Sequence, residues 1–168
     1  MAHPQRGAAL ITALLLLVVL TILGVSVMQM SRVQEKMAGN TRDINVGFET
    51  AEGALRNAEA LIRVQPLRPN TCTDNSCPYR GDDLGDVANQ NADWWVTNGR
   101  AFADSSGGQM TGVAENPRYV IEQITMLPDV PDPTDPGALR TFYRVTARST
   151  GASGLSNTIV QSTFARKD

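Results

Sequence analysis

The sequence predicts an α+β fold in which a long N-terminal helix packs on a C-terminal antiparallel β-sheet. Three observations predict it. A run without charged residues extends from Ala8 to Met28, and apolar residues then recur at helical spacing as far as residue 64. Three segments rich in β-branched and aromatic residues follow in the C-terminal third. The total of 168 residues is enough for one modest domain beside the apolar helix.

The run from Ala8 to Met28 is the most informative stretch. Its 21 residues are interrupted only by Thr12, Thr21, Gly24 and Ser26. At about 1.5 Å rise per residue, a helix of this length spans roughly 30 Å, the thickness of a bilayer hydrocarbon core. A helix that is apolar on every side has no comparable place in a soluble domain of this size. The run therefore belongs in lipid or in the core of a helical assembly.

Residues 1–7, MAHPQRG, form a short leader with one basic side chain, Arg6, ahead of the apolar run. A secretory signal peptide would have a shorter apolar region followed by a small-x-small cleavage site, whereas Gln29 to Arg32 is a poor site. One interpretation is thus an uncleaved signal anchor, with its N-terminus on the cytoplasmic side that Arg6 favours. A single-pass periplasmic scaffold or sensor protein would have this organisation.

A second interpretation explains more of the sequence. The pair Arg6-Gly7 followed by Ala8-Ala9-Leu10-Ile11-Thr12 resembles the class III leader of type IV pilins and pseudopilins. The resemblance implies that a prepilin peptidase cuts between Gly7 and Ala8 on the cytoplasmic face and then methylates the new amine of Ala8. There is one departure from the family pattern, because the fifth residue after the cut is usually Glu and here is Thr12.

The departure at position 12 has a physical consequence. A carboxylate in an apolar helix is costly unless a cation pairs with it, and in pilins the implied partner is the N-terminal amine of a neighbouring subunit. The hydroxyl of Thr12 cannot neutralise an amine, but it can bond to a carbonyl of its own helix. Two interpretations stay open: the residue is simply tolerated in a membrane helix, or it belongs to a subunit that stands first, at a filament tip.

Residues 29–64 continue the helix as an amphipathic segment. Its apolar positions recur three or four residues apart, with Thr41 filling one gap: Met30, Val33, Met37, Ile44, Phe48, Ala51, Leu55, Ala58 and Ile62. We expect the helix to end near Val64, because Pro66 and Pro69 cannot continue it. Either a coiled-coil partner or the chain's own C-terminal domain must cover this apolar stripe.

Two short motifs in this segment resemble the N-terminal region of PilX-type minor pilins. They are Met37-Ala38-Gly39-Asn40 and the run Phe48-Glu49-Thr50-Ala51-Glu52-Gly53-Ala54-Leu55. The resemblance covers the leader and the predicted helix, and Tyr143 to Arg148 and Gln161 to Phe164 also resemble the closing strands of that family. It implies a type IV pilin-like fold and a minor pilin of the type IVa pilus.

By that resemblance the protein joins other minor pilins in a complex near the pilus tip and primes assembly of the major pilin, which supports twitching motility and adhesion. The other implied partners are the prepilin peptidase, the inner-membrane assembly platform and, before assembly, membrane lipid. The implied location is the inner membrane, with a periplasmic head, and then the pilus fibre. A pseudopilin of a type II secretion system is a further alternative, although the pseudopilin that shares the missing Glu is usually larger.

Residues 65–168 are expected to form the periplasmic head, which begins with loops. Cys72 and Cys77 enclose four residues, and a disulfide between them is allowed on the exported side of a membrane. A zinc site would need four Cys or His ligands, but the only histidine is His3 in the leader. The spacing is also not that of a C-x-x-C redox motif. We therefore predict a local structural disulfide, no metal and no cofactor.

Two further features of the head leave alternatives open. Clustered acids could offer oxygen ligands to calcium, but they lack EF-hand spacing and are expected to be solvated turns. They are Asp82, Asp83, Asp86, Asp129, Asp132 and Asp135. Trp94-Trp95, with Phe102 nearby in sequence, predicts either a packing cluster over the helix stripe or an exposed contact patch. We expect at least one of the two tryptophans to lie in the core.

Three strands are predicted, at Arg118 to Leu127, Leu139 to Thr150 and Leu155 to Arg166. Short links between them indicate an antiparallel meander. In the middle strand, alternate residues point to opposite faces. The face expected to pack on the helix carries Thr141, Tyr143, Val145 and Ala147, and the other face carries Arg140, Phe142, Arg144, Thr146 and Arg148.

The row formed by Arg140, Arg144 and Arg148 could contact phosphate. Three charges without stacked aromatics are weak grounds for a nucleic-acid partner, and the net charge of −2 adds no support. A solvated sheet face or a contact with a protein partner is the simpler interpretation.

We predict no enzymatic activity, because the exported part contains no histidine, no G-x-S-x-G motif and no phosphate-binding loop. A filament subunit and a membrane-anchored scaffold are the remaining classes. Both need a membrane helix, but only a filament subunit needs a cut after Gly7 and a helix that leaves the bilayer.

Overall fold

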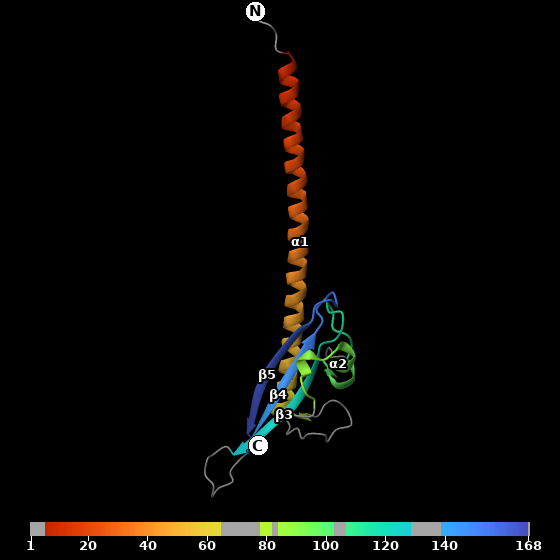
Figure 1. The fold of residues 1–168 in the computed structure, drawn as a ribbon. Helices are drawn as coiled ribbons and strands as arrows, with labels where there is room; N and C mark the ends of the chain where they lie inside the picture. Colours follow the sequence, from red (N-terminus) through yellow and green to blue (C-terminus); the bar gives the residue numbers. More distant parts are fainter. Residues whose placement is uncertain (1–5, 65–77, 82–83, 103–106, 129–138, 168) are drawn as a thin grey trace, which may run out of the picture. The chain divides into compact units, whose positions relative to one another are not determined.

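The computed structural model describes residues 6–64, 78–81, 84–102, 107–128 and 139–167. Along the chain the elements are α1 (Arg6–Val64), β1 (Tyr79–Arg80), the 3-10 helix η1 (Val87–Asn89), α2 (Ala92–Asn98), β2 (Arg100–Ala101), β3 (Arg118–Pro128), β4 (Leu139–Ser149) and β5 (Thr158–Lys167) (Figure 1). The chain divides into two compact units, residues 1–42 and residues 43–168.

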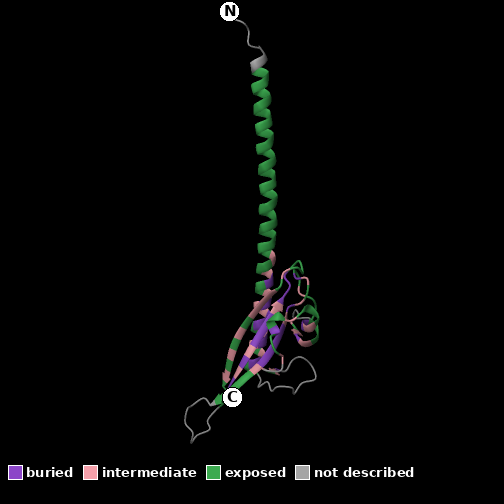
Figure 2. Ribbon diagram, in the orientation of Figure 1, coloured by how far each residue is buried: buried purple, intermediate pink, exposed green. Residues whose placement is uncertain are grey.

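The first unit consists of the N-terminal part of α1. No proline interrupts the helix, so the apolar run and the amphipathic segment form one element, as the sequence predicts. From Ala9 to Arg42 every side chain is exposed, and Figure 2 shows this part of the ribbon in the colour of exposed residues. The helix ends at Val64, which confirms the predicted end.

The second unit, which we call the head, contains the remainder of α1 and a five-stranded sheet. Strands β3, β4 and β5 lie side by side as an antiparallel meander, which confirms the prediction (Figure 1). The two-residue strands β1 and β2 pair with β3, the first in parallel and the second antiparallel. The sheet as a whole is therefore mixed, with a purely antiparallel centre.

One face of the sheet packs on the C-terminal part of α1. The buried residues of this core are Ala54, Leu55, Ala58 and Ile62 of the helix with Tyr119, Ile121, Tyr143, Val145 and Ala147 of the strands. The β4 side chains predicted to face the helix are thus the ones that do. Small helix residues let the backbone approach the sheet closely: a Cβ on Gly47 would lie 2.9 Å from Oγ1 of Thr158.

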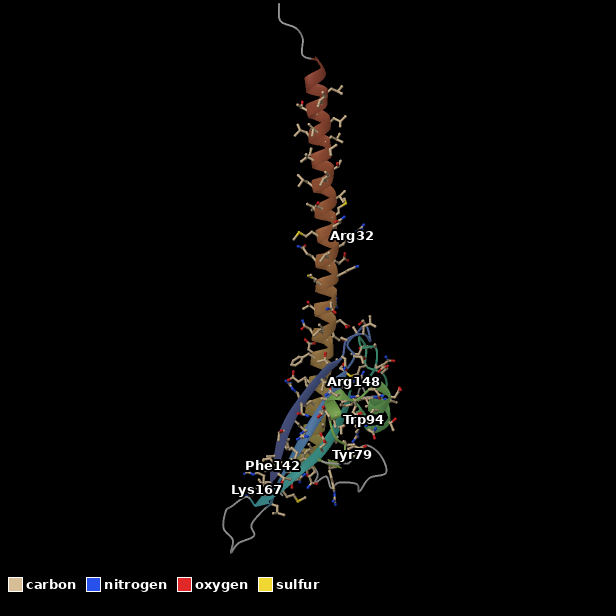
Figure 3. The ribbon with its side chains drawn as sticks, in the orientation of Figure 1. Arg32, Tyr79, Trp94, Phe142, Arg148 and Lys167 are labelled. Carbon is tan, nitrogen blue, oxygen red and sulfur yellow. The ribbon has the colours of Figure 1, made fainter. Side chains whose placement is uncertain are left out.

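The opposite face of the sheet has a second, smaller core. Trp95 of α2 is fully buried there with Val87 of η1 and Val120 of β3. Trp94, which Figure 3 labels, is half-buried. Its ring meets that of Trp95 edge to face, with 5.5 Å between the ring centroids. The expectation that at least one tryptophan lies in the core is confirmed. The cluster does not lie over the helix stripe, however, because Trp95 packs with Val120, which is on the face of β3 opposite to α1. Of the three aromatic residues Trp94, Trp95 and Phe102, only Phe102 packs against the helix-side core.

Helix α2 is short but has clear boundaries. Its N-cap is Asn91, whose side-chain oxygen accepts a hydrogen bond of 2.8 Å from the backbone N–H of Trp94. At its other end the N–H of Gly99 bonds to the carbonyl of Trp95. A Cβ on Gly99 would meet that carbonyl at 2.7 Å, so the tight exit from the helix requires glycine.

Candidate functional site

The apolar run at the start of α1 is the first candidate site. Its large side chains are exposed from end to end, for example Leu10 at 70% and Met28 at 69%. Removing one such side chain from water is worth about 1.5–3 kcal/mol, so a helix that presents this many must be covered by lipid or by other helices. Among the described helices, α1 alone has the length and apolar composition needed to cross a membrane.

The polar residues inside the run are satisfied within the helix itself. The hydroxyl of Thr12 donates to the carbonyl of Ala9 at 3.0 Å, as the sequence led us to expect. Thr21 donates to Val18 at 2.7 Å, and Ser26 donates to Ile22 at 2.9 Å. Hydroxyls bonded in this way cost little in an apolar environment. The Gly7–Ala8 bond lies in the first turn of α1, and its cleavage stays a prediction.

The exposure of the amphipathic stripe differs between the two units of the chain. In the first unit Met30, Val33 and Met37 are exposed. In the head, Ile44 and Phe48 are still about half exposed, and the first buried member of the stripe is Ala51, although the neighbouring Gly47 is already buried against the sheet. The chain's own head therefore covers the C-terminal part of the predicted stripe and leaves its N-terminal part, in the described residues, without a cover.

The head holds its part of the helix by polar contacts as well as by packing. The Asp43 carboxylate accepts hydrogen bonds from the backbone N–H of Ser153 at 2.7 Å and from its hydroxyl at 2.8 Å. These bonds from Ser153 lower the pKa of Asp43. About two helical turns further on, Thr50 and Ser149 share a hydrogen bond of 2.8 Å. The turn between β4 and β5 is thereby tied to the helix at the first residue of the head.

Comparison with known proteins identifies the family. The family model described as PilX N-terminal matches residues 6–56, and the model described as type IV pilus assembly protein PilX C-term matches residues 63–166. The chain belongs to the PilX family of type IV pilus assembly proteins. No curated protein and no solved structure matches the chain. Together with the apolar helix, PilX membership supports membrane anchoring and association with other pilus components.

The arrangement of the head is the α+β, type IV pilin-like one that PilX membership implies, with a long helix on a sheet. PilX proteins are structural components of pilus assembly, and nothing in the described residues indicates catalysis. The cysteines Cys72 and Cys77 lie outside the described residues, so their disulfide stays a prediction.

Most of the acids considered for calcium also lie outside the described residues. Of these acids, only Asp86 lies among the described residues, and it accepts a hydrogen bond of 2.6 Å from the side chain of Asn89. Within the described parts of the PilX head, no three Asp, Glu, His or Cys side chains come together in a way that could hold a metal ion.

The row of arginines on β4 makes contacts inside the head. Arg148 donates to the side chain of Asn157 at 2.8 Å, and Arg144 lies 4.0 Å from a carboxylate oxygen of Glu122. Arg140 also has a partner. Phe142 and Arg148, labelled in Figure 3, belong to the same face of β4. These contacts favour the structural interpretation of the row over a phosphate-binding one.

Glu122 is a residue that sequence analysis missed. It lies in the middle of β3 with 1% of its surface exposed, and neither carboxylate oxygen has a hydrogen-bond partner in the described head. Burial raises the pKa of Glu122, and the nearby Arg144 partly opposes the rise. The available signal was a single acid that follows the apolar residues Tyr119 to Ile121 and alternates onto the same face as Val120.

Proposed function

We propose that this protein is a minor pilin that enters a priming complex at the tip of a type IVa pilus and promotes assembly of the major pilin. The observation that carries the proposal is the pairing of a PilX-family match along the chain with a helix whose large apolar side chains are exposed along its first half. Such a helix cannot remain in water, and a filament core of parallel helices covers it completely. Twitching motility and adhesion depend on the pili that result.

The N-terminal events follow from the resemblance of the leader. Residues 1–7 are a prepilin leader, the prepilin peptidase cuts between Gly7 and Ala8, and Ala8 becomes the methylated N-terminus. Residues 8–28 then reside in the inner membrane, and residues 29–64 continue the helix into the periplasm, where residues 65–168 complete the head. The inner-membrane assembly platform lifts the helix from lipid into the filament. Because lipid tails and neighbouring apolar helices are similar solvents for Leu and Val, the transfer has a small free-energy cost.

The residue at position 12 supports a place at the tip. A subunit added below an existing one would use a carboxylate at this position to pair with the amine of its neighbour, whereas Thr12 directs its hydroxyl to Ala9. A subunit that stands first has no such amine to neutralise. The partners above and beside it are other minor pilins, and the major pilin follows.

A deletion strain tests the proposal. Loss of the protein is expected to remove most surface pili and twitching, with both restored by the full-length chain. Normal pilus numbers in the deletion strain would contradict the proposal. Loss of type II secretion with pili intact would instead identify a pseudopilin, and loss of neither would point to a membrane-anchored scaffold or sensor.

A further inference from the structure

The first charged residues after the apolar run of α1 are Arg32, Glu35 and Lys36. At about 1.5 Å per residue, residues 8–28 fill a hydrocarbon core of roughly 30 Å, and the headgroup region adds roughly 5–8 Å on each side. Arg32 lies about 6 Å beyond Met28 along the helix, and Lys36 lies about 12 Å beyond it. When the run spans a bilayer, Arg32 is therefore level with the lipid headgroups, and Lys36 follows one helical turn further out.

Both basic side chains can reach the same layer of headgroups. Residues four apart lie on one face of a helix, one above the other, so Arg32 and Lys36 form a pair. Side chains of a helix lean toward its N-terminus, which in α1 is the direction of the apolar run. Long basic side chains at the end of a membrane helix extend to the interface in this way. The pair therefore directs a guanidinium group and an ammonium group toward one level of the membrane.

The pair is available to a ligand. The three charged side chains of this segment are exposed, and within the described parts of the chain none of them makes a hydrogen bond or an ion pair. Figure 3 labels Arg32 in this exposed part of α1. At about 100° of rotation per residue, the pair is centred roughly 110° from the apolar stripe of Met30, Val33 and Met37. A neighbouring helix can thus cover the stripe while Arg32 and Lys36 stay in contact with lipid.

We propose that Arg32 and Lys36 bind the phosphate group of an anionic phospholipid in the membrane leaflet nearer to them. The two cations outnumber the single acid Glu35, so this segment attracts negative charge. A headgroup such as phosphocholine adds a cation beside the phosphate, which the pair repels, so a headgroup with a net negative charge is preferred. The inference rests on the membrane location proposed for residues 8–28 and adds the class of lipid. The bound lipid fixes the depth of the helix and has to be released when the subunit leaves the membrane.

Native mass spectrometry of the full-length chain, released from nanodiscs of equal parts phosphatidylglycerol and phosphatidylcholine, tests the proposal. The two lipids differ in net charge, so the ratio in which the protein retains them reports headgroup preference. The wild-type chain is expected to retain phosphatidylglycerol in several-fold excess. Arg32→Gln and Lys36→Gln are each expected to lower this excess by about two- to fivefold, and the double variant should abolish most of it.

Two control variants separate a lipid site from a general effect of charge. Arg42→Gln removes one positive charge from an exposed position about 21 Å beyond Met28, outside the reach of the headgroups, and should leave the lipid ratio unchanged. Glu35→Gln removes the acid beside the pair and should raise the excess of phosphatidylglycerol. Equal retention of the two lipids by the wild-type chain, or the same loss in Arg42→Gln as in Arg32→Gln, would overturn the proposal.

The amount of the protein in sheared pili, measured in the native strain, keeps this proposal separate from the proposed function. The double variant at Arg32 and Lys36 is expected to shift several-fold from the membrane into pili, because its extraction no longer has to release a lipid. Normal incorporation into pili without a lipid preference in nanodiscs would overturn the lipid site alone. A lipid preference in a protein that pili do not need would support the lipid site and overturn the proposed function. If the double variant is lost from pili while its lipid ratio stays that of the wild-type chain, the pair contacts a protein and the lipid site is wrong.

Discussion

Helix α1 is packed on the sheet in the head and exposed in the first unit, and its residues differ between the two parts. In the head its buried face consists largely of small residues, Gly47, Ala51, Ala54 and Ala58, and the sheet approaches the backbone closely. In the first unit the exposed face is built from large residues such as Leu10 and Met28. Small residues let the sheet pack closely on the helix backbone within the chain. Large apolar residues that are exposed would gain the most free energy if lipid or another helix buried them. The difference separates the part of the helix that the head buries from the part whose apolar side chains stay exposed.

Placing a charge in the helix–sheet contact should have the largest effect. Ala58 is fully buried in the helix-side core, so Ala58→Glu is expected to lower the free energy of unfolding of the head by about 3–5 kcal/mol. The exposed neighbour Ala60 provides the matched control, Ala60→Glu, for which we expect little change. Urea unfolding of the full chain in detergent measures both, and equal stabilities would contradict the described packing.

The buried acid Glu122, on the sheet face opposite to α1, should make the stability of the head depend on pH. Because the pKa of Glu122 is raised above its ordinary value of 4.5, its ionisation destabilises the head as the pH rises above that value. Glu122→Gln is expected to raise the free energy of unfolding at neutral pH by on the order of 1 kcal/mol and by less in acid. Thermal unfolding across pH measures the difference. The exposed Glu115→Gln is the control, and a destabilised Glu122→Gln variant at neutral pH would refute the prediction.

A charge in the exposed part of the apolar stripe, at Met30, Val33 or Met37, should affect incorporation into pili but not the stability of the head. Val33→Asp is expected to change the stability of the head by less than about 0.5 kcal/mol, because Val33 is an exposed residue of the first unit. It should nevertheless reduce the amount of the protein in purified pili several-fold, since a partner helix would have to bury the charge. Gln34→Asp, at an exposed neighbouring position, tests whether any added acid has this effect. Normal incorporation of Val33→Asp would separate the stripe from assembly.

Position 12 should matter only for placement within the filament. Thr12→Glu restores the carboxylate usual in pilins, and we expect it to shift the protein from the tip into the shaft without a change in head stability. Thr12→Ser retains a hydroxyl that can bond to the helix and should leave the distribution unchanged. Immunogold labelling of pili measures the position. If the Glu variant labels pili in the wild-type pattern, the argument for a tip position from Thr12 fails.

The sequence predicted most reliably what is decided locally. The end of α1 at Val64 follows from Pro66, and the alternation in β4 placed Tyr143 and Val145 on the helix side. It did not predict that Trp95 packs on the far face of the sheet or that β1 joins in parallel. Both depend on how the chain between α1 and β3 crosses the sheet, and no local periodicity encodes that path.

The burial of Glu122 could not be predicted for a similar reason. Its neighbours in β3 indicated a strand, but they did not indicate that the face shared with Val120 is an interior one, where η1 and α2 contribute the core around Val120. The sequence also did not predict which part of the stripe the head covers, because apolar residues recur with the same spacing from Met30 to Ile62. The sequence shows which positions are apolar, and the fold decides which of them the chain itself can bury.

The mass of the N-terminal peptide from the native, membrane-derived protein tests the central claim most directly. If α1 is an assembly helix of a PilX-family pilin, the chain begins at Ala8 and carries a methyl group on its amine. A chain that still begins at Met1 or Ala2 would be a signal-anchored membrane protein, and the assignment of its exposed helix to a filament core would be wrong.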